Sequence, residues 1–152
     1  MRVTAKELWG YCSEILLAGL IVTFFCMTFG ADKVSAAVGR AGDSFAGTLF
    51  AVLLAGSFAL VWAIFSKVDS KFYVWLDSIG ALDVYIRGMM YAVLVEFMAT
   101  LAAVSSKWVD NESFRLLFAF VMSLGAINGI TMAGNALGLM RLNALFERLS
   151  QL

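Results

Sequence analysis

The side chain best placed to do chemistry in this sequence is a carboxylate inside an apolar run. The stretch from Tyr91 to Val104 reads YAVLVEFMATLAAV, and Glu96 is the one acid in it. An ionised carboxylate at mid-bilayer costs at least ~2.5–3.5 kcal/mol. We therefore expect Glu96 to be protonated, to face water, or to bind a cation.

Polar residues also recur at helical spacing along a later apolar run. They are Asn128, Thr131 and Asn135. If the two runs form adjacent antiparallel helices, Glu96 and Asn128 lie at one depth, and the Asn128 amide can hydrogen-bond the Glu96 carboxyl. Repeated around an oligomer, such acids would form a cation filter or proton site. The alternative is a neutral Glu96 in a structural hydrogen bond. Glu14, only about one turn inside the first run, is expected to reach the interface.

Other chemistry is largely excluded by composition. The chain has no histidine, which rules out imidazole-based zinc and haem sites and a Ser-His-Asp triad. Cys12 and Cys26 lie about 21 Å apart along a helix, beyond disulfide reach. Eleven basic residues balance eleven acidic ones, so no basic surface favours nucleic acid. We expect no catalytic residues, metal site or other cofactor.

Hydropathy places these residues in a membrane. The chain is 62% hydrophobic and 14% charged, whereas globular domains have about 45–50% and about 25%. Four apolar runs approach the ~17–25 residues that a membrane-spanning helix needs, and none alternates as barrel strands do. The expected spans are approximately 9–31, 44–65, 88–106 and 116–140. We predict an all-α membrane protein in which 1–152 form one four-helix domain that contacts the lipid bilayer.

The segments between the runs are mostly short and polar. Asp43–Ser44 and Asp110–Asn111 are available as N-caps for the second and fourth helices. The longest connection, Ser66 to Arg87, carries apolar residues at spacings of three and four, which predicts an amphipathic helix in the interface plane. The residues of this stripe are Phe72, Trp75, Leu76, Ile79 and Leu82.

The C-terminal tail, 141–152, is predicted to continue the fourth helix beyond the membrane. Its sequence RLNALFERLSQL has an apolar stripe. The residues of the stripe are Leu142, Leu145, Phe146 and Leu149. An apolar stripe outside the bilayer indicates a binding partner, either a second copy of the chain or a cytosolic protein.

Small residues follow one another every four positions in two of the spans, an arrangement that lets helix backbones approach closely. The second span has Gly47, Ala51, Ala55, Ala59 and Ala63, and the fourth has the pairs Gly125 and Gly129, and Gly134 and Gly138. Packing within one chain and packing between subunits are both open. Because four helices cannot use all these faces internally, we expect a homo-oligomer.

Charge predicts the orientation of the spans. With the N-terminus inside, seven basic residues lie on the cytoplasmic side and four on the other, which agrees with the positive-inside rule. The inner set is Arg2, Lys6, Lys67, Lys71, Arg87, Arg141 and Arg148, and the outer set is Lys33, Arg40, Lys107 and Arg115. Both termini are therefore expected in the cytoplasm, and the membrane is expected to be a bacterial inner membrane.

Two functions follow as hypotheses. The first is an oligomeric component of a multi-protein bacterial system, a sensor, scaffold or effector of defence (anti-phage) or secretion type, which engages a cytosolic partner through the tail. The alternative is an ion or proton channel, transporter or holin-like pore centred on Glu96 and Asn128. An enzyme is not expected, because the loops carry only scattered Asp and Ser.

Overall fold

A computed structural model describes residues 5–41 and 45–150, and every regular element in these ranges is helical. Four helices are long and apolar enough to cross a membrane: α1 (Ala5–Phe29), α3 (Phe45–Phe65), α5 (Ala81–Ser105) and α6 (Glu112–Leu149). Three short elements accompany them: α2 (Ala31–Ala41), α4 (Lys71–Ser78) and the 3-10 turn η1 (Ser106–Trp108). The prediction of an all-helical chain with four helices long and apolar enough to cross a membrane is thus confirmed.

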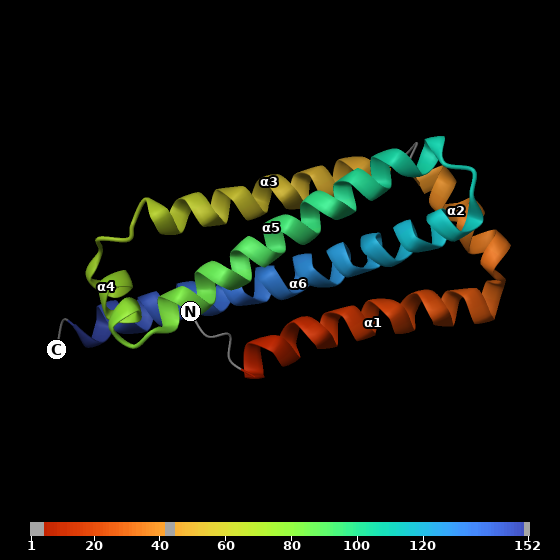
Figure 1. Ribbon diagram of the computed structural model, residues 1–152. Coiled ribbons are helices and arrows are strands. Elements are labelled where there is room, and N and C mark those ends of the chain that lie inside the picture. Colours follow the sequence, from red (N-terminus) through yellow and green to blue (C-terminus); the bar gives the residue numbers. More distant parts are fainter. Residues whose placement is uncertain (1–4, 42–44, 151–152) are drawn as a thin grey trace.

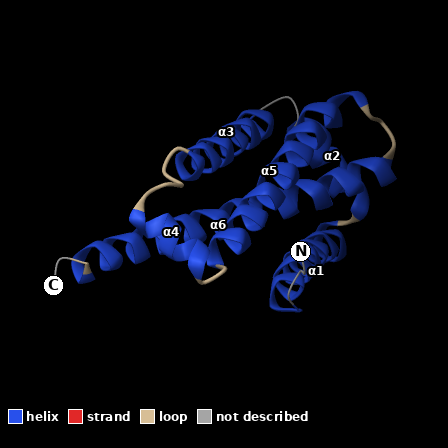
Figure 2. Ribbon diagram, turned by 60° about the vertical axis from the view of Figure 1, so that its left-hand side comes forward, coloured by secondary structure: helices blue, strands red, loops and turns tan. Residues whose placement is uncertain are grey.

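The long helices lie side by side in the order α3, α5, α6, α1, with α3 and α1 at opposite edges (Figures 1 and 2). Helix α5 packs against both α3 and α6, and α1 packs against α6. The beginning of α1 and the end of α6 lie at the same end of the bundle as α4 (Figure 1). Helix α2 and η1 pack together at the other end.

The interior consists of two apolar clusters with buried polar side chains between them. The cluster near α4 contains Ile64, Phe72, Leu76, Leu82, Met89 and Leu139. The cluster toward the opposite end contains Phe50, Ala99 and Ala103. Along α3, α5 and α6 respectively, Ser57, Glu96 and Asn128 fall between these clusters, and all three are buried. The middle of the bundle therefore holds a buried acid and a buried amide between two apolar clusters.

The connection after α1 differs from the short polar loop expected there. Residues Ala31–Ala41 form a helix that buries Ser35 and Val38 and packs against α6 and η1. Gly30 has a φ of +92°, a conformation that glycine adopts without strain, and it separates α1 from α2. The predicted cap at Asp43–Ser44 lies outside the described residues.

The segment 66–87 is not one amphipathic helix. Gly80, with a φ of +71°, ends the short α4 and α5 begins at Ala81, seven residues before the predicted span. Phe72 and Leu76 are buried in the cluster near α4, whereas Ile79 is exposed. Much of the predicted interfacial stripe is therefore covered by this chain's own helices.

Helix α6 is continuous from Glu112 to Leu149, about 57 Å at 1.5 Å per residue. It is capped as predicted, because the Asn111 side chain accepts a hydrogen bond from the Phe114 backbone N–H at 3.2 Å. About 20 residues suffice for a ~30 Å hydrocarbon layer. The expected helical extension beyond the fourth span is thus present as far as the structure describes the tail.

Candidate functional site

Glu96 lies on the buried face of α5, as its spacing predicts. Ala92, Ala99 and Ala103 are buried on the same face, while Leu94, Met98 and Leu101 on the other sides are exposed. The Glu96 side chain is 0% exposed. The carboxyl therefore points into the contact between α5, α6 and α3 rather than toward lipid.

Glycines on α6 make room for this contact. A Cβ atom at Gly129 would lie 3.1 Å from Glu96 Oε1 and 3.3 Å from a Leu53 methyl. One turn earlier, a Cβ at Gly125 would lie 2.5 Å from the Ala99 Cβ. At position 125 only glycine allows α6 to lie this close to α5, and position 129 leaves little room for a side chain, so this glycine pair serves packing within the chain.

The Glu96 carboxyl has no hydrogen-bond partner among the described residues. Both oxygens are fully enclosed and unpaired. An unpaired buried polar group costs about 1–3 kcal/mol, and an ionised one costs far more. Enclosure without a partner therefore favours the neutral form of the Glu96 carboxyl over the ionised form.

The predicted hydrogen bond between Asn128 and Glu96 is wrong, although the predicted depth is right. Gly129, next to Asn128, contacts the Glu96 carboxyl, so both residues lie at one level. The Asn128 Nδ2 instead donates to Glu14 Oε2 at 3.0 Å. Asn128 is oriented toward α1, and Glu14 lies partly buried against the bundle instead of extending to the interface.

Glu14 and Asn128 line a cleft of about 450 Å³ between α1, α5 and α6. Its remaining polar lining comes from Tyr11, Tyr85, Tyr91, Thr131 and Asn135. The rings of Tyr11 and Tyr91 are 4.4 Å apart and join α1 to α5, and the Tyr91 hydroxyl is buried. Three of the four residues predicted as an intramembrane polar site thus share one cleft, and Glu96 does not line it.

Glu96 nevertheless lies directly beyond this cleft. Ala92 lines the cleft, and Glu96 follows one helical turn later on the same face of α5. On α6 the cleft residue Asn128 is the immediate neighbour of Gly129, which contacts Glu96. Because the cleft also includes Gly10 and Ala81, near the starts of α1 and α5, it leads from one end of the bundle toward Glu96.

The Asn128 carbonyl oxygen is a further buried acceptor at this point. Its Oδ1 is enclosed and has no hydrogen-bond partner among the residues that the structure describes. Together with the Glu14 carboxylate it offers oxygen atoms to a proton donor or a small cation. Within the described ranges, no three His, Cys, Asp or Glu side chains gather as a metal site.

The other small-residue series point outward. Ala51, Ala55, Ala59 and Ala63 are exposed along α3, and Gly47 is half-buried beside Val104. Helix α3 contacts the bundle through other residues instead, including Phe50, Ser57 and Ile64. Nothing lies within 4 Å of a Cβ atom added at Gly134 or Gly138 on α6. Of the predicted packing residues, Gly125 and Gly129, together with Gly47 at one end of α3, are the ones used within this chain.

The apolar stripe of the tail is partly covered by α4. Leu142 and Phe146 pack against the cluster near α4, and the Phe146 ring lies 5.7 Å from Phe72 and 5.3 Å from Trp75. Leu145 and Leu149 are exposed. Helix α4 of the same chain therefore covers half of the apolar stripe that was predicted to bind a cytosolic protein.

The residue that sequence reasoning undervalued is Glu14. Its signal was present, because it is an acid within an apolar run, but counting from the end of the run suggested that it escapes to the interface. Its neighbours belong to helices more than 60 residues away in the chain.

Comparison with protein families, with curated proteins and with solved structures finds no match for this chain.

Proposed function

We propose that this chain is a non-enzymatic integral membrane protein that admits a proton or small cation to acids inside the bilayer. The observation that carries the proposal is the Asn128–Glu14 hydrogen bond inside a polar cleft, with a partnerless Glu96 one turn beyond. Acids inside a membrane are expensive, and they commonly mark ion or proton pathways. This supports the alternative hypothesis over a scaffold that works through its tail.

The exposure of each side chain indicates its role in binding the proton or cation. Glu14 is partly exposed in the cleft and is the first acceptor, while the Asn128 amide holds one of its oxygens in place. The unpaired Asn128 Oδ1 adds a second oxygen at this position. Glu96 is the enclosed acid, and reaching it from the cleft requires a small movement between α5 and α6. A cleft open at one end with an acid behind it suits alternating exposure to the two sides.

The cleft faces the cytoplasm in this proposal, and the membrane is a bacterial inner membrane. The excess of basic residues around the ends of the helices near α4 supports this orientation. Trp9 and Trp62 are exposed near that end and Trp108 near the other, as expected for side chains at the two interfaces. Helix α4 then lies at the level of the cytoplasmic headgroups.

The test is flux in sealed proteoliposomes. The full chain is reconstituted, a pH or potassium gradient is imposed, and its decay is followed with an internal dye. Glu14→Gln and Glu96→Gln are each expected to lower the protein-dependent rate at least tenfold. Glu112→Gln, which removes an exposed acid at the start of α6, is the matched control and is expected to leave the rate unchanged.

Two results would overturn the proposal. One is a gradient that decays no faster with protein than in empty vesicles. The other is a rate that Glu14→Gln and Glu96→Gln leave at the wild-type value while both variants reconstitute as well-folded protein. Circular dichroism and size-exclusion elution of each variant establish that the comparison is between folded chains.

A second candidate is an oligomeric scaffold, and one observation favours it. The exposed stripe Ala51, Ala55, Ala59 and Ala63 provides a flat helix face at which a second copy could approach closely. Substituting Ala55→Leu together with Ala59→Leu is expected to reduce the oligomer, measured by light scattering in detergent. Val52→Leu, on another exposed part of α3, is the control. A wild-type chain that is monomeric in detergent and in lipid discs contradicts this candidate.

A further inference from the structure

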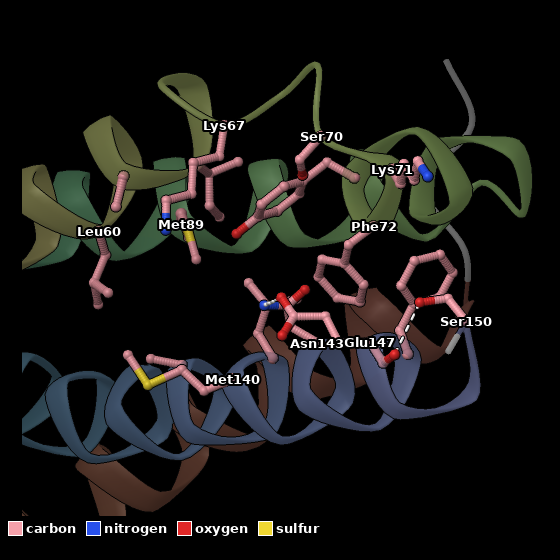
Figure 3. Close-up of a pocket in the computed structure, with 16 residues that line it drawn as sticks. Leu60, Lys67, Ser70, Lys71, Phe72, Met89, Met140, Asn143, Glu147 and Ser150 are labelled. Atoms are coloured by element: carbon pink, nitrogen blue, oxygen red, sulfur yellow. Dashed lines mark hydrogen bonds between the residues drawn. The ribbon is translucent and has the colours of Figure 1, made fainter. Parts of the chain in front are cut away.

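A second and larger cavity opens at the end of the bundle that carries α4. It has a volume of about 640 Å³ and lies between the end of α3, α4 and the C-terminal part of α6 (Figure 3). The volume falls within the ~300–1,000 Å³ of small-molecule sites. Glu14, Asn128 and Glu96 do not line this cavity, so it is separate from the cleft of the proposed function.

The cavity has an apolar part and a charged part. Toward the middle of the bundle its walls are aliphatic, with Leu60, Ala63 and Met140 on facing sides of α3 and α6. Toward the end of the bundle the rings of Phe72 and Phe146 are joined by polar side chains, and Lys67, Lys71 and Glu147 carry the charges. Figure 3 shows Lys67 extending from the end of α3 toward α6. A ligand that fills both parts must have an apolar tail and a charged head.

The position of the charged part fits a lipid headgroup. Lys67 follows the last residue of α3 by two positions, so it lies where a span that ends at Phe65 leaves the hydrocarbon. Trp62 is exposed one turn earlier, at the depth where tryptophans mark the membrane interface. Basic pockets between spans at this level bind lipid headgroups.

The charges select the kind of headgroup. No carboxylate among the described residues lies within ion-pair distance of Lys67 or Lys71, so both ammonium groups are open to a phosphate. Glu147, held by the Asn143 amide at 3.3 Å, presents an anion to the same cavity. A purely anionic headgroup would be repelled by the Glu147 carboxylate. A headgroup with a phosphate and a primary ammonium can instead pair with the lysine ammonium groups and with Glu147.

We propose that this cavity binds a phospholipid of the phosphatidylethanolamine class. Its phosphate lies at Lys67, its ammonium donates to Glu147, and one acyl chain lies between α3 and α6 along Leu60, Ala63 and Met140. The bound lipid fills the space beneath α4 and ties α4 to both α3 and α6.

The test measures lipid binding to the full chain purified in a non-ionic detergent. Phosphatidylethanolamine, phosphatidylglycerol and phosphatidylcholine of identical acyl chains are added separately, and bound lipid is counted by native mass spectrometry. Phosphatidylethanolamine is expected to bind at least fivefold more tightly than either of the others. Lys67→Gln is expected to weaken all three lipids, and Glu147→Gln is expected to abolish the preference over phosphatidylglycerol.

Two control variants separate the cavity from general effects. Arg141→Gln removes a positive charge at the same end of α6 without lining the cavity, and is expected to leave binding unchanged. Ala63→Phe fills the apolar part and is expected to prevent binding. Ala59→Phe adds the same ring one turn away on the same exposed stripe, outside the cavity, and is expected to bind normally.

The proposal is overturned if phosphatidylglycerol binds as tightly as phosphatidylethanolamine. It is also overturned if Arg141→Gln weakens binding as much as Lys67→Gln, or if Ala63→Phe and Ala59→Phe behave alike. Because these readouts are equilibrium binding and not flux, they are independent of whether the chain conducts protons or cations.

Discussion

Gly129 lies directly against the buried carboxyl of Glu96. A Cβ atom at position 129 would come within 3.1 Å of Glu96 Oε1, and the carboxyl is 0% exposed. The missing side chain lets α6 close over the acid and exclude lipid from it. The depth and isolation of Glu96 are therefore set by a residue on a different helix.

The first prediction concerns the glycines of α6. Gly125→Ala is expected to destabilise the fold by about 1–3 kcal/mol, because the new methyl would meet the Ala99 Cβ at 2.5 Å. Gly134→Ala is the control, since nothing lies within 4 Å of the added Cβ, and it is expected to be neutral or to stabilise α6 by up to ~1 kcal/mol. Unfolding in mixed detergent gives both values. Equal destabilisation by the two substitutions would contradict the packing described for Gly125.

The second prediction tests the protonation of Glu96. Because the carboxyl is enclosed and unpaired, a neutral amide of the same shape should replace it with little change. Glu96→Gln is expected to alter the free energy of unfolding by less than about 1 kcal/mol. Glu96→Lys places a cation at the same point and is expected to cost at least ~2.5–3.5 kcal/mol. If Glu96→Gln is as damaging as Glu96→Lys, the wild-type residue is an ionised carboxylate with a partner.

The third prediction concerns the hydrogen bond between Asn128 and Glu14. A double-mutant cycle with Asn128→Ala and Glu14→Ala is expected to give a coupling energy of about 0.5–1.5 kcal/mol in unfolding experiments. Thr131→Ala with Glu14→Ala is the comparison cycle, because Thr131 lines the same cleft but donates to the Ile127 carbonyl. Coupling energies that do not differ between the two cycles would show that Asn128 does not hold Glu14.

The fourth prediction concerns α4 and the tail. Phe146→Ala removes a ring that contacts both Phe72 and Trp75, so α4 is expected to exchange its amide hydrogens at least tenfold faster. Leu149→Ala removes an exposed side chain of the same tail and is expected to leave exchange in α4 unchanged. Hydrogen exchange followed by mass spectrometry resolves the two segments. Protection of α4 that survives Phe146→Ala would mean that α4 is held by α5 alone.

Much of the fold follows from the sequence because length and hydropathy act locally. The four spans, the small residues that share a face with Glu96 and the cap at Asn111 each depend on neighbours within a few turns of the same helix. The helical nature of Ala31–Ala41 was missed because its mean hydropathy is low and its stability comes from packing on α6 and η1. The break at Gly80 was missed because the apolar spacing continues across it.

By itself the sequence determined a four-helix membrane protein, with an acid inside its third span and small residues along two others. Only the tertiary structure decided which faces meet. It paired Asn128 with Glu14 rather than Glu96, and it packed Gly125 and Gly129 against α5 while leaving Ala51, Ala55, Ala59 and Ala63 exposed. It also covered Phe146 with α4. The physical reason is that helical periodicity fixes what shares a face, whereas the neighbour of that face depends on how closely backbones approach and on which helix lies alongside.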